Sequence, residues 1–268
     1  MSFPAPAPGA FALITGASQG IGEAIARQLA AEGHNLILVA RRQEVLQKLG
    51  DELSLAHGID VEIFAGDLSK ARDVDALIEH IANRTVSICV NSAGIASFGP
   101  FMAQDWEYET NQFNLNATAV FRITKAVLDQ MVPRGEGALC NVGSAAGNLP
   151  IPNNATYVFT KAGVNMFTEA LHYELKDSGV HVTLLAPGPV REAYIPEEEQ
   201  TIVDKVVPDF LWTTYESCAA ETIRAMKANR RRIVPGPLSK AMDVVSNYAP
   251  RGWLPPIMGK FYAQMGEE

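Results

Sequence analysis

Residues 11–32 read FALITGASQGIGEAIARQLAAE: an apolar run, a glycine-rich turn and an amphipathic stretch. The run from Phe11 to Thr15 is continuously apolar rather than alternating, which is typical of a strand buried on both faces. From Ile21 to Glu32, apolar residues recur at every third or fourth position, as they do on one face of a helix. The stretch therefore predicts a strand, a tight turn and a helix in immediate succession.

The turn, residues 15–22, reads TGASQGIG and has the context of a dinucleotide-binding loop between a strand and a helix. Gly16 permits the tight turn, Gly20 lets the backbone approach a pyrophosphate, and Gly22 allows the helix to pack closely on the sheet. The N–H groups at the helix start then face the phosphates. A simple glycine turn is the alternative, and the position of the loop argues against it. The loop residues expected to contact the cofactor are Gly16, Ser18, Gln19, Gly20, Ile21 and Gly22.

The same alternation of apolar runs and helical stretches continues along the chain. Successive βα units predict a parallel sheet with right-handed crossovers. We expect one domain over residues 1–268 with an α/β fold, a Rossmann-type doubly wound parallel sheet of about seven strands with helices on both faces. A long helical region is expected from Ala103 to Val132. The strands are expected at Phe11–Thr15, Asn35–Ala40, Val61–Phe64, Val86–Val90, Ala138–Val142, Val180–Leu185 and Arg232–Val234.

The composition is that of an ordinary globular protein. With 268 residues, of which 47% are hydrophobic and 19% charged, the chain can bury a full core. The net charge of -8 argues against a nucleic-acid partner, because binding nucleic acid requires a basic face. No apolar run is long enough to span a bilayer, and the start, MSFPAPAPGA, lacks the features of a signal peptide. We therefore expect a cytoplasmic protein.

The cysteines and histidines indicate neither a disulfide framework nor a metal site. Cys89, Cys140 and Cys218 are far apart, and two of them fall inside strand-like runs. Buried thiols in a reducing compartment are therefore expected rather than disulfides. The five histidines show no metal-ligand spacing such as HExxH, so no metal is expected.

The end of the second predicted strand favours a particular cofactor. Folds that bind NAD usually place an Asp or Glu there for the ribose 2′-hydroxyl, whereas an arginine accommodates the 2′-phosphate of NADP. This strand ends in Arg41 and Arg42 with no carboxylate, and a guanidinium matches a phosphate well. We expect NADP(H), with Arg41 as the main contact and Arg42 either supporting it or solvated at the helix start. Asp67 and Leu68, after the third strand, are expected near the adenine; Asp67 could instead cap the next helix, a role that suits Ser69 better.

The stretch from Ser144 to Lys161, SAAGNLPIPNNATYVFTK, carries the candidate chemistry. Tyr157 and Lys161 are four residues apart in a predicted helix and should project side by side. A free phenol titrates near pH ~10, and an adjacent ammonium favours the phenolate, so Lys161 is expected to lower the pKa of Tyr157. A tyrosine tuned in this way can exchange a proton during catalysis. Ser144, on the loop after a strand, could hydrogen-bond a carbonyl oxygen.

Taken together, these motifs resemble the short-chain dehydrogenase/reductase family over nearly the whole chain. The glycine loop matches the TGxxxGIG pattern of the family, and Asn91-Ser92-Ala93-Gly94 matches its NNAG stretch with one serine for asparagine. The family often has a threonine where Glu192 stands, which leaves the side-chain partner of the nicotinamide amide open. The resemblance implies that Asn91, Ala93, Gly94, Pro187, Gly188 and Val190 contact the cofactor, and that the catalytic residues are Asn114, Ser144, Tyr157 and Lys161.

The resemblance also implies a role for each catalytic residue. Tyr157 protonates the carbonyl oxygen as hydride arrives from the nicotinamide, and Ser144 orients and polarises the carbonyl. Lys161 lowers the pKa of Tyr157 and holds the cofactor ribose, so both Tyr157 and Lys161 also count as cofactor contacts. Asn114 holds a water that links Lys161 to solvent; Asn116 is the alternative for this role. Members of the family are usually dimers or tetramers, so a homo-oligomer is expected.

Two stretches near the end of the chain concern the substrate. The segment near 191–214 contains an acidic run and then VVPDFLW, which could form a lid over an apolar substrate or pack on the body of the protein. The tail near 235–265 is apolar with interleaved Lys240, Arg251 and Lys260. This tail could line an acyl-chain site, contact a membrane surface peripherally or lie in a subunit interface.

Four stretches make the chain similar to the mycolate-reductase branch of the family. They are residues 143–148 (GSAAGN), 186–191 (APGPVR), 207–212 (VPDFLW) and 239–242 (SKAM). The resemblance implies NADPH-dependent reduction of the β-keto group of a long-chain, α-branched acyl (mycolate) precursor. Reduction or oxidation of a smaller alcohol, sugar or steroid is the alternative. A non-catalytic NADP-binding sensor is a third hypothesis, and it does not need the intact Tyr157.

Overall fold

The computed structural model describes residues 2–192 and 212–248. The acidic run and most of the apolar run of the predicted lid, and the tail beyond Tyr248, lie outside the described residues. Within the described part, a two-stranded parallel ladder of β7 (Val190–Arg191) and β8 (Thr213–Thr214) joins the two ends of the lid segment. No helix in residues 2–192 or 212–248 is both long and apolar enough to cross a membrane.

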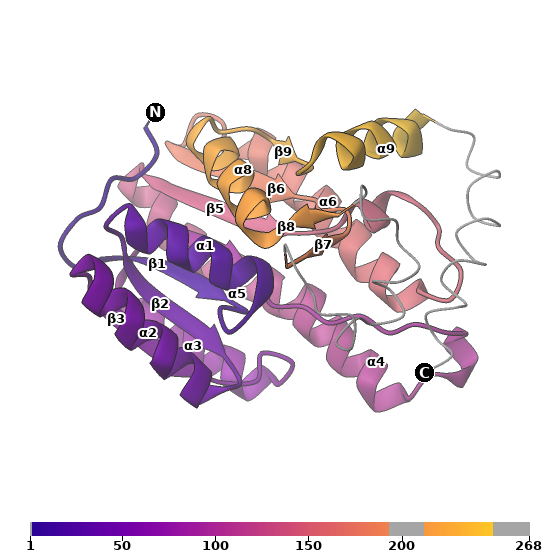
Figure 1. Ribbon diagram of the computed structural model, residues 1–268, viewed down its shortest axis with the longest axis horizontal. Helices are drawn as coiled ribbons and strands as arrows, with labels where there is room; N and C mark the ends of the chain where they lie inside the picture. Colours follow the sequence, from indigo (N-terminus) through magenta and orange to yellow (C-terminus); the bar gives the residue numbers. More distant parts are fainter. Residues whose placement is uncertain (1, 193–211, 249–268) are drawn as a thin grey trace.

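The described strands form one seven-stranded sheet and the small β7–β8 ladder (Figure 1). In the large sheet the order is β3-β2-β1-β4-β5-β6-β9, and every neighbouring pair is parallel. The predicted doubly wound α/β sheet is therefore confirmed. Its strands are β1 (Ala10–Thr15), β2 (Asn35–Ala40), β3 (Val61–Ala65), β4 (Thr85–Asn91), β5 (Gly137–Val142), β6 (Val180–Leu185) and β9 (Arg232–Ile233).

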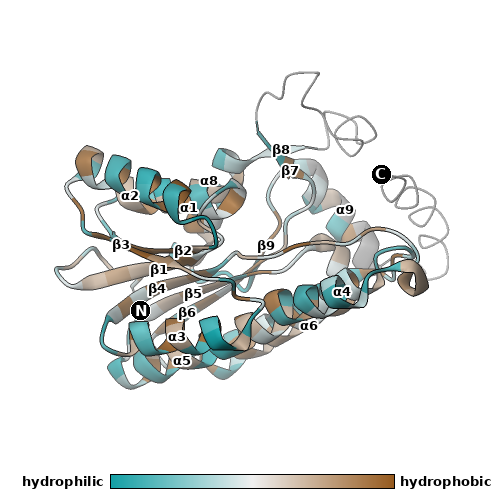
Figure 2. Cartoon of the chain, turned by 90° about the horizontal axis from the view of Figure 1, so that it is seen from below, coloured by the Kyte–Doolittle hydropathy of each residue, from teal (hydrophilic) through white to brown (hydrophobic). Residues whose placement is uncertain are grey.

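Helices cover both faces of this sheet (Figure 2). On one face lie α1 (Gly20–Ala31), α2 (Gln43–His57) and α8 (Tyr215–Lys227). On the other lie α3 (Ala71–Ala82), α4 (Trp106–Phe113), α5 (Val120–Arg134) and α6 (Ala155–Glu174). Two short 3₁₀ turns, η1 (Phe101–Ala103) and η3 (Ala145–Asn148), and the helix α9 (Pro237–Tyr248) are also present.

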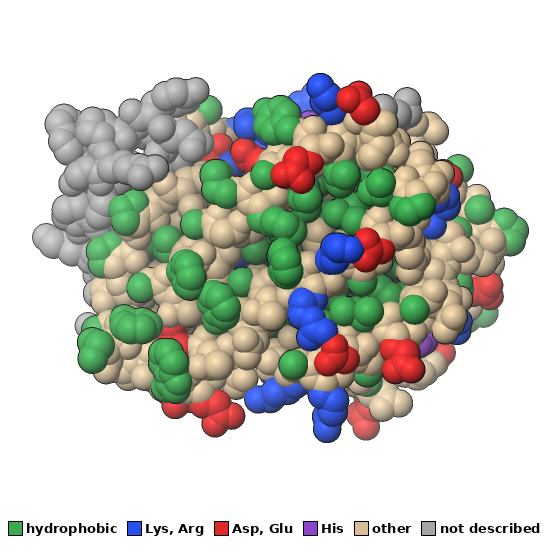
Figure 3. Space-filling model, turned by 180° about the vertical axis from the view of Figure 1, so that it is seen from behind, with side chains coloured by type: hydrophobic (Ala, Val, Ile, Leu, Met, Phe, Trp, Pro, Cys, Tyr) green, Lys and Arg blue, Asp and Glu red, His purple; other side chains and the backbone are tan. Residues whose placement is uncertain are grey.

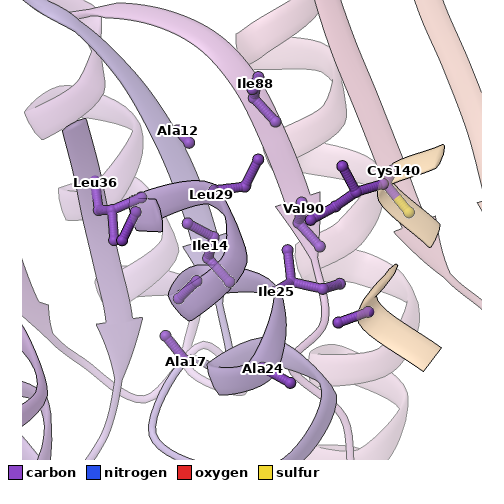
Figure 4. Close-up of a cluster of buried hydrophobic side chains, with 14 of the residues drawn as sticks. Ala12, Ile14, Ala17, Ala24, Ile25, Leu29, Leu36, Ile88, Val90 and Cys140 are labelled. Carbon is purple, nitrogen blue, oxygen red and sulfur yellow. The ribbon is translucent and has the colours of Figure 1, made fainter. Parts of the chain in front are cut away.

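Two apolar layers sandwich the sheet, and this explains why its strands are continuously apolar. Successive side chains of a strand point to opposite faces. In β2, Leu36 and Leu38 therefore pack in the layer under α1 and α2, whereas Ile37 and Val39 pack in the layer under α3 and α5. Figure 4 shows the first layer, in which Ile25 and Leu29 of α1 lie against strand residues such as Ile14 and Val90.

The strand order reverses direction around β1. The chain first moves outward from β1 through β2 to β3, then returns to pair β4 with the other side of β1. The loops that leave β1 and β4 therefore part in opposite directions and open a crevice at the carboxyl ends of these strands. In sheets of this type, that crevice is where ligands bind.

The helical region predicted from Ala103 to Val132 is real but not uniform. Between α4 and α5 the chain makes a π-helical turn, η2 (Asn114–Ala119). Such turns insert an extra residue into the helix and are frequent at functional sites. The wider turn changes which side chains of this region face the sheet, and both candidate asparagines lie on it.

Candidate functional site

A cavity of about 580 Å³ lies at the carboxyl ends of the central strands. Its volume is in the range of small-molecule and cofactor sites. Most of the predicted cofactor contacts line it: Gly16, Ser18, Gln19, Gly20, Ile21, Arg41, Arg42, Asp67, Leu68, Ala93, Gly94, Tyr157, Lys161, Pro187, Gly188 and Val190. The cavity thus brings together residues from six separate loops or helices.

The glycine loop is shaped by close backbone approach. Gly16 has φ +70, and a Cβ there would be 2.8 Å from the backbone nitrogen of Ala93 on the neighbouring loop. Gly22 lies outside the cavity lining because it packs inward; a Cβ on it would be 2.3 Å from the carbonyl oxygen of Gly16. The side chain of Gln19 does not cap α1, which leaves N–H groups of the first turn able to bind phosphate. The loop therefore fits a pyrophosphate.

The two arginines at the end of β2 differ in what they contact. Arg42 donates through Nη2 to the carbonyl oxygen and hydroxyl of Ser18, both at 3.1 Å, and to Oε1 of Gln19 at 2.6 Å. Arg42 thus ties the start of α2 to the glycine loop. Arg41 is exposed at the cavity wall. Its role as the main contact of the 2′-phosphate stays a prediction.

Asp67 and Asn91, both predicted cofactor contacts, make hydrogen bonds within the protein. Asp67 lines the cavity, and its Oδ1 accepts the backbone N–H of Ser69 at 3.0 Å. The N-cap of α3 is Lys70, so neither Asp67 nor Ser69 takes that position. Asn91 lies outside the cavity lining; it is buried and donates to Oδ1 of Asn141 at 2.9 Å. Its side chain therefore fixes the ends of β4 and β5.

Ser144, Tyr157 and Lys161 come together where β5 ends against α6. Lys161 is buried, and its Nζ donates to the carbonyl oxygen of Val142, the last residue of β5, at 2.8 Å. The same Nζ lies 5.7 Å from the centroid of the Tyr157 ring. Ser144 follows two residues after Val142 and hydrogen-bonds Tyr157. A carbonyl oxygen placed between the two hydroxyl groups would meet both.

The pKa of Tyr157 moves in the direction opposite to the sequence-based prediction. Burial of the phenol raises the pKa of Tyr157, and only the hydrogen bond with Ser144 acts to lower it. Lys161 makes no contribution that lowers it, and burial lowers the pKa of Lys161 itself to about 8. Burial therefore disfavours the charged form of both groups, although Lys161, with a pKa of about 8, still holds its proton at pH 7. A tyrosine that keeps its proton at neutral pH is suited to donate it.

Asn116, rather than Asn114, makes the contacts next to Lys161. The side chain of Asn116 is fully buried and bonds both backbone groups of Ile95, with its Oδ1 3.0 Å from the nitrogen and its Nδ2 2.8 Å from the oxygen. Gly94 lies between Asn116 and Lys161. A Cβ on Gly94 would be 3.2 Å from Oδ1 of Asn116 and 3.4 Å from Nζ of Lys161. Asn114 is half-buried on the same turn. The geometry favours the alternative asparagine.

The Pro-Gly turn after β6 closes the far end of the cavity. Pro187, Gly188 and Val190 line it, and the carbonyl oxygen of Pro187 accepts the N–H of Ala145 beside Ser144 at 3.0 Å. Glu192 is exposed just beyond β7. The side-chain partner of the nicotinamide amide, left open by the sequence at this position, therefore stays open.

Several residues that line the cavity were missed from the sequence. Tyr215, at the start of α8, reaches across the glycine loop, and a Cβ on Gly20 would be 3.4 Å from its ring. Nothing in the sequence places Tyr215 there, because it is nearly 200 residues from that loop. The other missed lining residues are Val39, Ala40, Gly66, Ser92, Ile95, Ala96, Leu115, Val142 and Gly143. Most of these adjoin a predicted motif and could have been found by extending it.

The described residues hold no group of three or more His, Cys, Asp or Glu side chains that could bind a metal. The cavity instead offers the backbone of the glycine loop, two exposed guanidinium groups (Arg41 and Arg42), and the side chains of Tyr157 and Lys161 with the buried Ser144 next to them. This chemistry suits an anionic dinucleotide and a proton transfer to a carbonyl oxygen.

A family model of short chain dehydrogenases matches residues 10–201, which is well over half of the chain. The chain belongs to the short chain dehydrogenase family. A solved member, a short-chain dehydrogenase from Sphingobium yanoikuyae in complex with NADPH, is 30% identical with a TM-score of 0.79. The similarity covers 91% of this dehydrogenase and 94% of that chain.

Two relatives with similar sequences are named for different reactions. A very-long-chain 3-oxoacyl-CoA reductase of Neurospora crassa is 38% identical over 66% of the chain and 55% of the relative. Sulfoacetaldehyde reductase 2 of Chromohalobacter salexigens is 35% identical over 79% of the chain and 84% of the relative. The chain thus spans little more than half the length of the fungal reductase.

The lowered pKa of Lys161 predicts how stability depends on pH without cofactor. Between pH 8 and the ordinary value of 10.5, the folded lysine is neutral whereas the unfolded one still holds its proton. The unfolded state then binds more protons, so stability rises with pH in this window. We expect the wild type to gain free energy of unfolding relative to Lys161→Met between pH 8 and 10.

Urea unfolding of both proteins at several pH values measures this difference, and other titrating groups cancel in the comparison. A difference that stays constant or falls over the window would contradict the buried ammonium.

Proposed function

We propose that this short chain dehydrogenase is an NADPH-dependent reductase that transfers hydride to a ketone, with Tyr157 as the proton donor. The observation that supports this most directly is that Tyr157 and Lys161 line the same cavity as the glycine loop, with the buried Ser144 hydrogen-bonded to Tyr157 behind them. The family gives the reaction class. The phenol of Tyr157, whose pKa is raised by burial, holds its proton at neutral pH and so is available as the donor for reduction.

The residues of the cavity fit NADP(H). The uncapped start of α1 and the glycine loop would hold the pyrophosphate, and Arg41 would hold the 2′-phosphate. Asp67 and Leu68 would border the adenine, and the Pro-Gly turn with Val190 would border the nicotinamide. The cofactor supplies the hydride. The similar Sphingobium yanoikuyae structure, in complex with NADPH, supports the assignment.

The protein residues act on the carbonyl oxygen. The hydroxyl of Ser144 donates a hydrogen bond to that oxygen and so polarises the carbonyl. As the carbonyl carbon gains hydride, negative charge develops on the oxygen, and the phenol of Tyr157 transfers its proton there. Lys161, which with a pKa of about 8 is mostly an ammonium at pH 7, then stabilises the phenolate that remains. We assign to Asn116 the role of ordering the loop beside Lys161.

Replacement of Tyr157 by Phe tests the proton donor. The substitution keeps the ring and removes the hydroxyl, so we expect kcat for ketone reduction to fall by about 10² to 10⁴. Binding of NADPH, followed by its fluorescence, should be nearly unchanged. Turnover equal to the wild type would exclude the mechanism and favour a cofactor-sensing protein.

The cofactor assignment is tested with Arg41→Ala. Loss of a charged hydrogen bond to the 2′-phosphate should weaken NADPH binding about 10- to 100-fold and leave NADH binding nearly unchanged. Arg72→Ala is a matched control, since Arg72 is exposed and pairs with its neighbour Asp73. Titration calorimetry with both cofactors gives the affinities. An equal loss for NADPH and NADH would remove Arg41 from the 2′-phosphate site.

We propose that the substrate carries its ketone at the β position of a long acyl chain, as in an α-branched mycolate precursor. The 3-oxoacyl-CoA reductase of Neurospora crassa supports a ketoacyl substrate, and the resemblance in the turn after β6 supports the mycolate branch. The sulfoacetaldehyde reductase favours the alternative, a small carbonyl compound.

Chain length separates these substrates. If the acyl chain binds to apolar surface, each buried methylene contributes about 0.8 kcal/mol, roughly fourfold in kcat/KM. We expect kcat/KM with NADPH to rise over a series of 3-oxoacyl thioesters of increasing length and again with an α-alkyl branch. Indifference to length, or faster reduction of the shortest members, would indicate the small-carbonyl alternative.

We further propose that the enzyme is a cytoplasmic homo-oligomer. The three free cysteines are buried thiols, which suits a reducing compartment. Exposed aromatic side chains gather on α4, α5 and α6, among them Trp106, Phe121 and Phe159. Figure 3 shows the molecule from behind, with many hydrophobic side chains on that face. A second copy of the chain is the proposed occupant; membrane contact through the tail rests on the sequence alone.

Phe121→Glu tests the interface. Phe121 is 59% exposed and contacts the ring of Phe167, so a charge there should disrupt pairing of two copies with little effect on the core. Leu55→Glu is the control, because Leu55 is 90% exposed on α2, on the other side of the sheet. Sedimentation velocity should show a smaller species for Phe121→Glu only. A wild type that is monomeric would overturn the proposal.

A further inference from the structure

Asn165 is a buried residue of α6 to which neither the family match nor the sequence motifs give a role. It lies one helical turn after Lys161 and two turns after Tyr157, so it continues the same helix face. Its side chain has no exposed surface. A buried amide must find hydrogen-bond partners within the protein, and the partners of Asn165 lie at the proposed active site.

The amide of Asn165 binds both backbone groups of Ser144. Its Oδ1 accepts the N–H of Ser144 at 3.3 Å, and its Nδ2 donates to the carbonyl oxygen of Ser144 at 2.9 Å. Two hydrogen bonds to one residue fix both the position and the orientation of that peptide segment. Because β5 ends at Val142, Ser144 has no sheet partner, and Asn165 takes the place of one.

The glycines on either side of Ser144 make room for this contact. A Cβ on Gly143 would be 1.9 Å from Oδ1 of Asn165, and a Cβ on Gly147 would be 2.7 Å from Nδ2. Neither glycine has a positive φ. Close approach to Asn165 and its helix, rather than backbone conformation, is therefore what excludes larger residues here.

A chain of polar contacts extends from Asn165 to α9. Nδ2 of Asn165 also donates to Oδ1 of Asn148 at 3.2 Å, and Nδ2 of Asn148 donates to Oδ1 of Asp243 on α9 at 2.8 Å. Arg232 donates to the same oxygen of Asp243 at 2.5 Å and pairs with Glu169 of α6 at 3.3 Å. The loop of Ser144 is therefore held between two helices.

We infer that Asn165 is a positioning residue for Ser144, held in turn by Asn148 and α9, and that it acts on ketone reduction through the serine hydroxyl. This inference rests on the role proposed above for Ser144. The hydroxyl of Ser144 accepts the N–H of Ala146 at 3.1 Å and hydrogen-bonds Tyr157. Displacement of the Ser144 backbone would misplace the hydroxyl relative to the carbonyl oxygen, while the proton donor and cofactor residues stay in place.

A double-mutant cycle tests the inference. Asn165→Leu keeps the approximate shape and removes both hydrogen bonds; we expect kcat to fall about 10- to 100-fold with KM for NADPH within about twofold. In a Ser144→Ala background the same substitution should lower kcat less than about threefold, because its effect passes through the lost hydroxyl. Thr168→Val is the matched control: Thr168 is also fully buried on α6 but bonds Val164 and Asn141.

The outcomes separate the two proposals. If Ser144→Ala retains wild-type kcat, the proposed role of Ser144 fails, and the role of Asn165 fails with it. If Ser144→Ala is impaired but Asn165→Leu is not, the catalytic proposal stands and the positioning role is wrong. The same conclusion follows if Asn165→Leu lowers kcat by the same factor with and without the Ser144 hydroxyl. Should Asn165→Leu not fold, Asn148→Ala removes the bonds of Asn148 with Asn165, Asp243 and Arg232 but keeps both bonds of Asn165 to Ser144. It should show a smaller fall in kcat, again absent without the Ser144 hydroxyl.

Discussion

The contact of α6 with the end of β5 is the constraint on which the rest of the site depends. Lys161 binds the carbonyl oxygen of Val142, and Asn165 binds both backbone groups of Ser144. A helix repeats every 3.6 residues, so Tyr157, Lys161 and Asn165 form one line along its surface. That line meets the chain just past the end of β5, where the backbone groups of Ser144 bind Asn165. The packing of α6 against the end of β5 thus positions Tyr157, Lys161 and Asn165 together.

Burial makes this contact both costly and useful. An ammonium removed from water loses hydration, and this loss shows as the lowered pKa of Lys161. The phenol of Tyr157 is affected in the opposite direction, since burial disfavours its anion. Burial thus keeps the proton on the tyrosine, while Lys161, with a pKa of about 8, is mostly an ammonium at pH 7 that can stabilise the phenolate once the proton has left. The environment therefore prepares the pair for donation before any substrate binds.

Much of the fold and of the cofactor loop could be predicted from the sequence. The continuous apolar strands, the glycine turn and the repeated βα units each follow from local residue patterns, and the sheet order agrees with them. The asparagine was the harder case. Asn114 and Asn116 are two residues apart on a π-helical turn, where the ordinary helical repeat does not tell which side chain faces Lys161. Contacts with Ile95 and Gly94 were needed to favour Asn116.

By itself the sequence determined which residues share a strand, a turn or a helix face, because these relations repeat over a few positions and depend on the local backbone. Tertiary structure decided how those faces are buried and what lies opposite them. Only the tertiary structure gave the direction of the Tyr157 pKa shift, the position of Tyr215 over the glycine loop and the hydrogen bonds of Asn165 to Ser144. Each of these features arises from desolvation or from contact between distant segments, and local residue spacing encodes neither of these two causes.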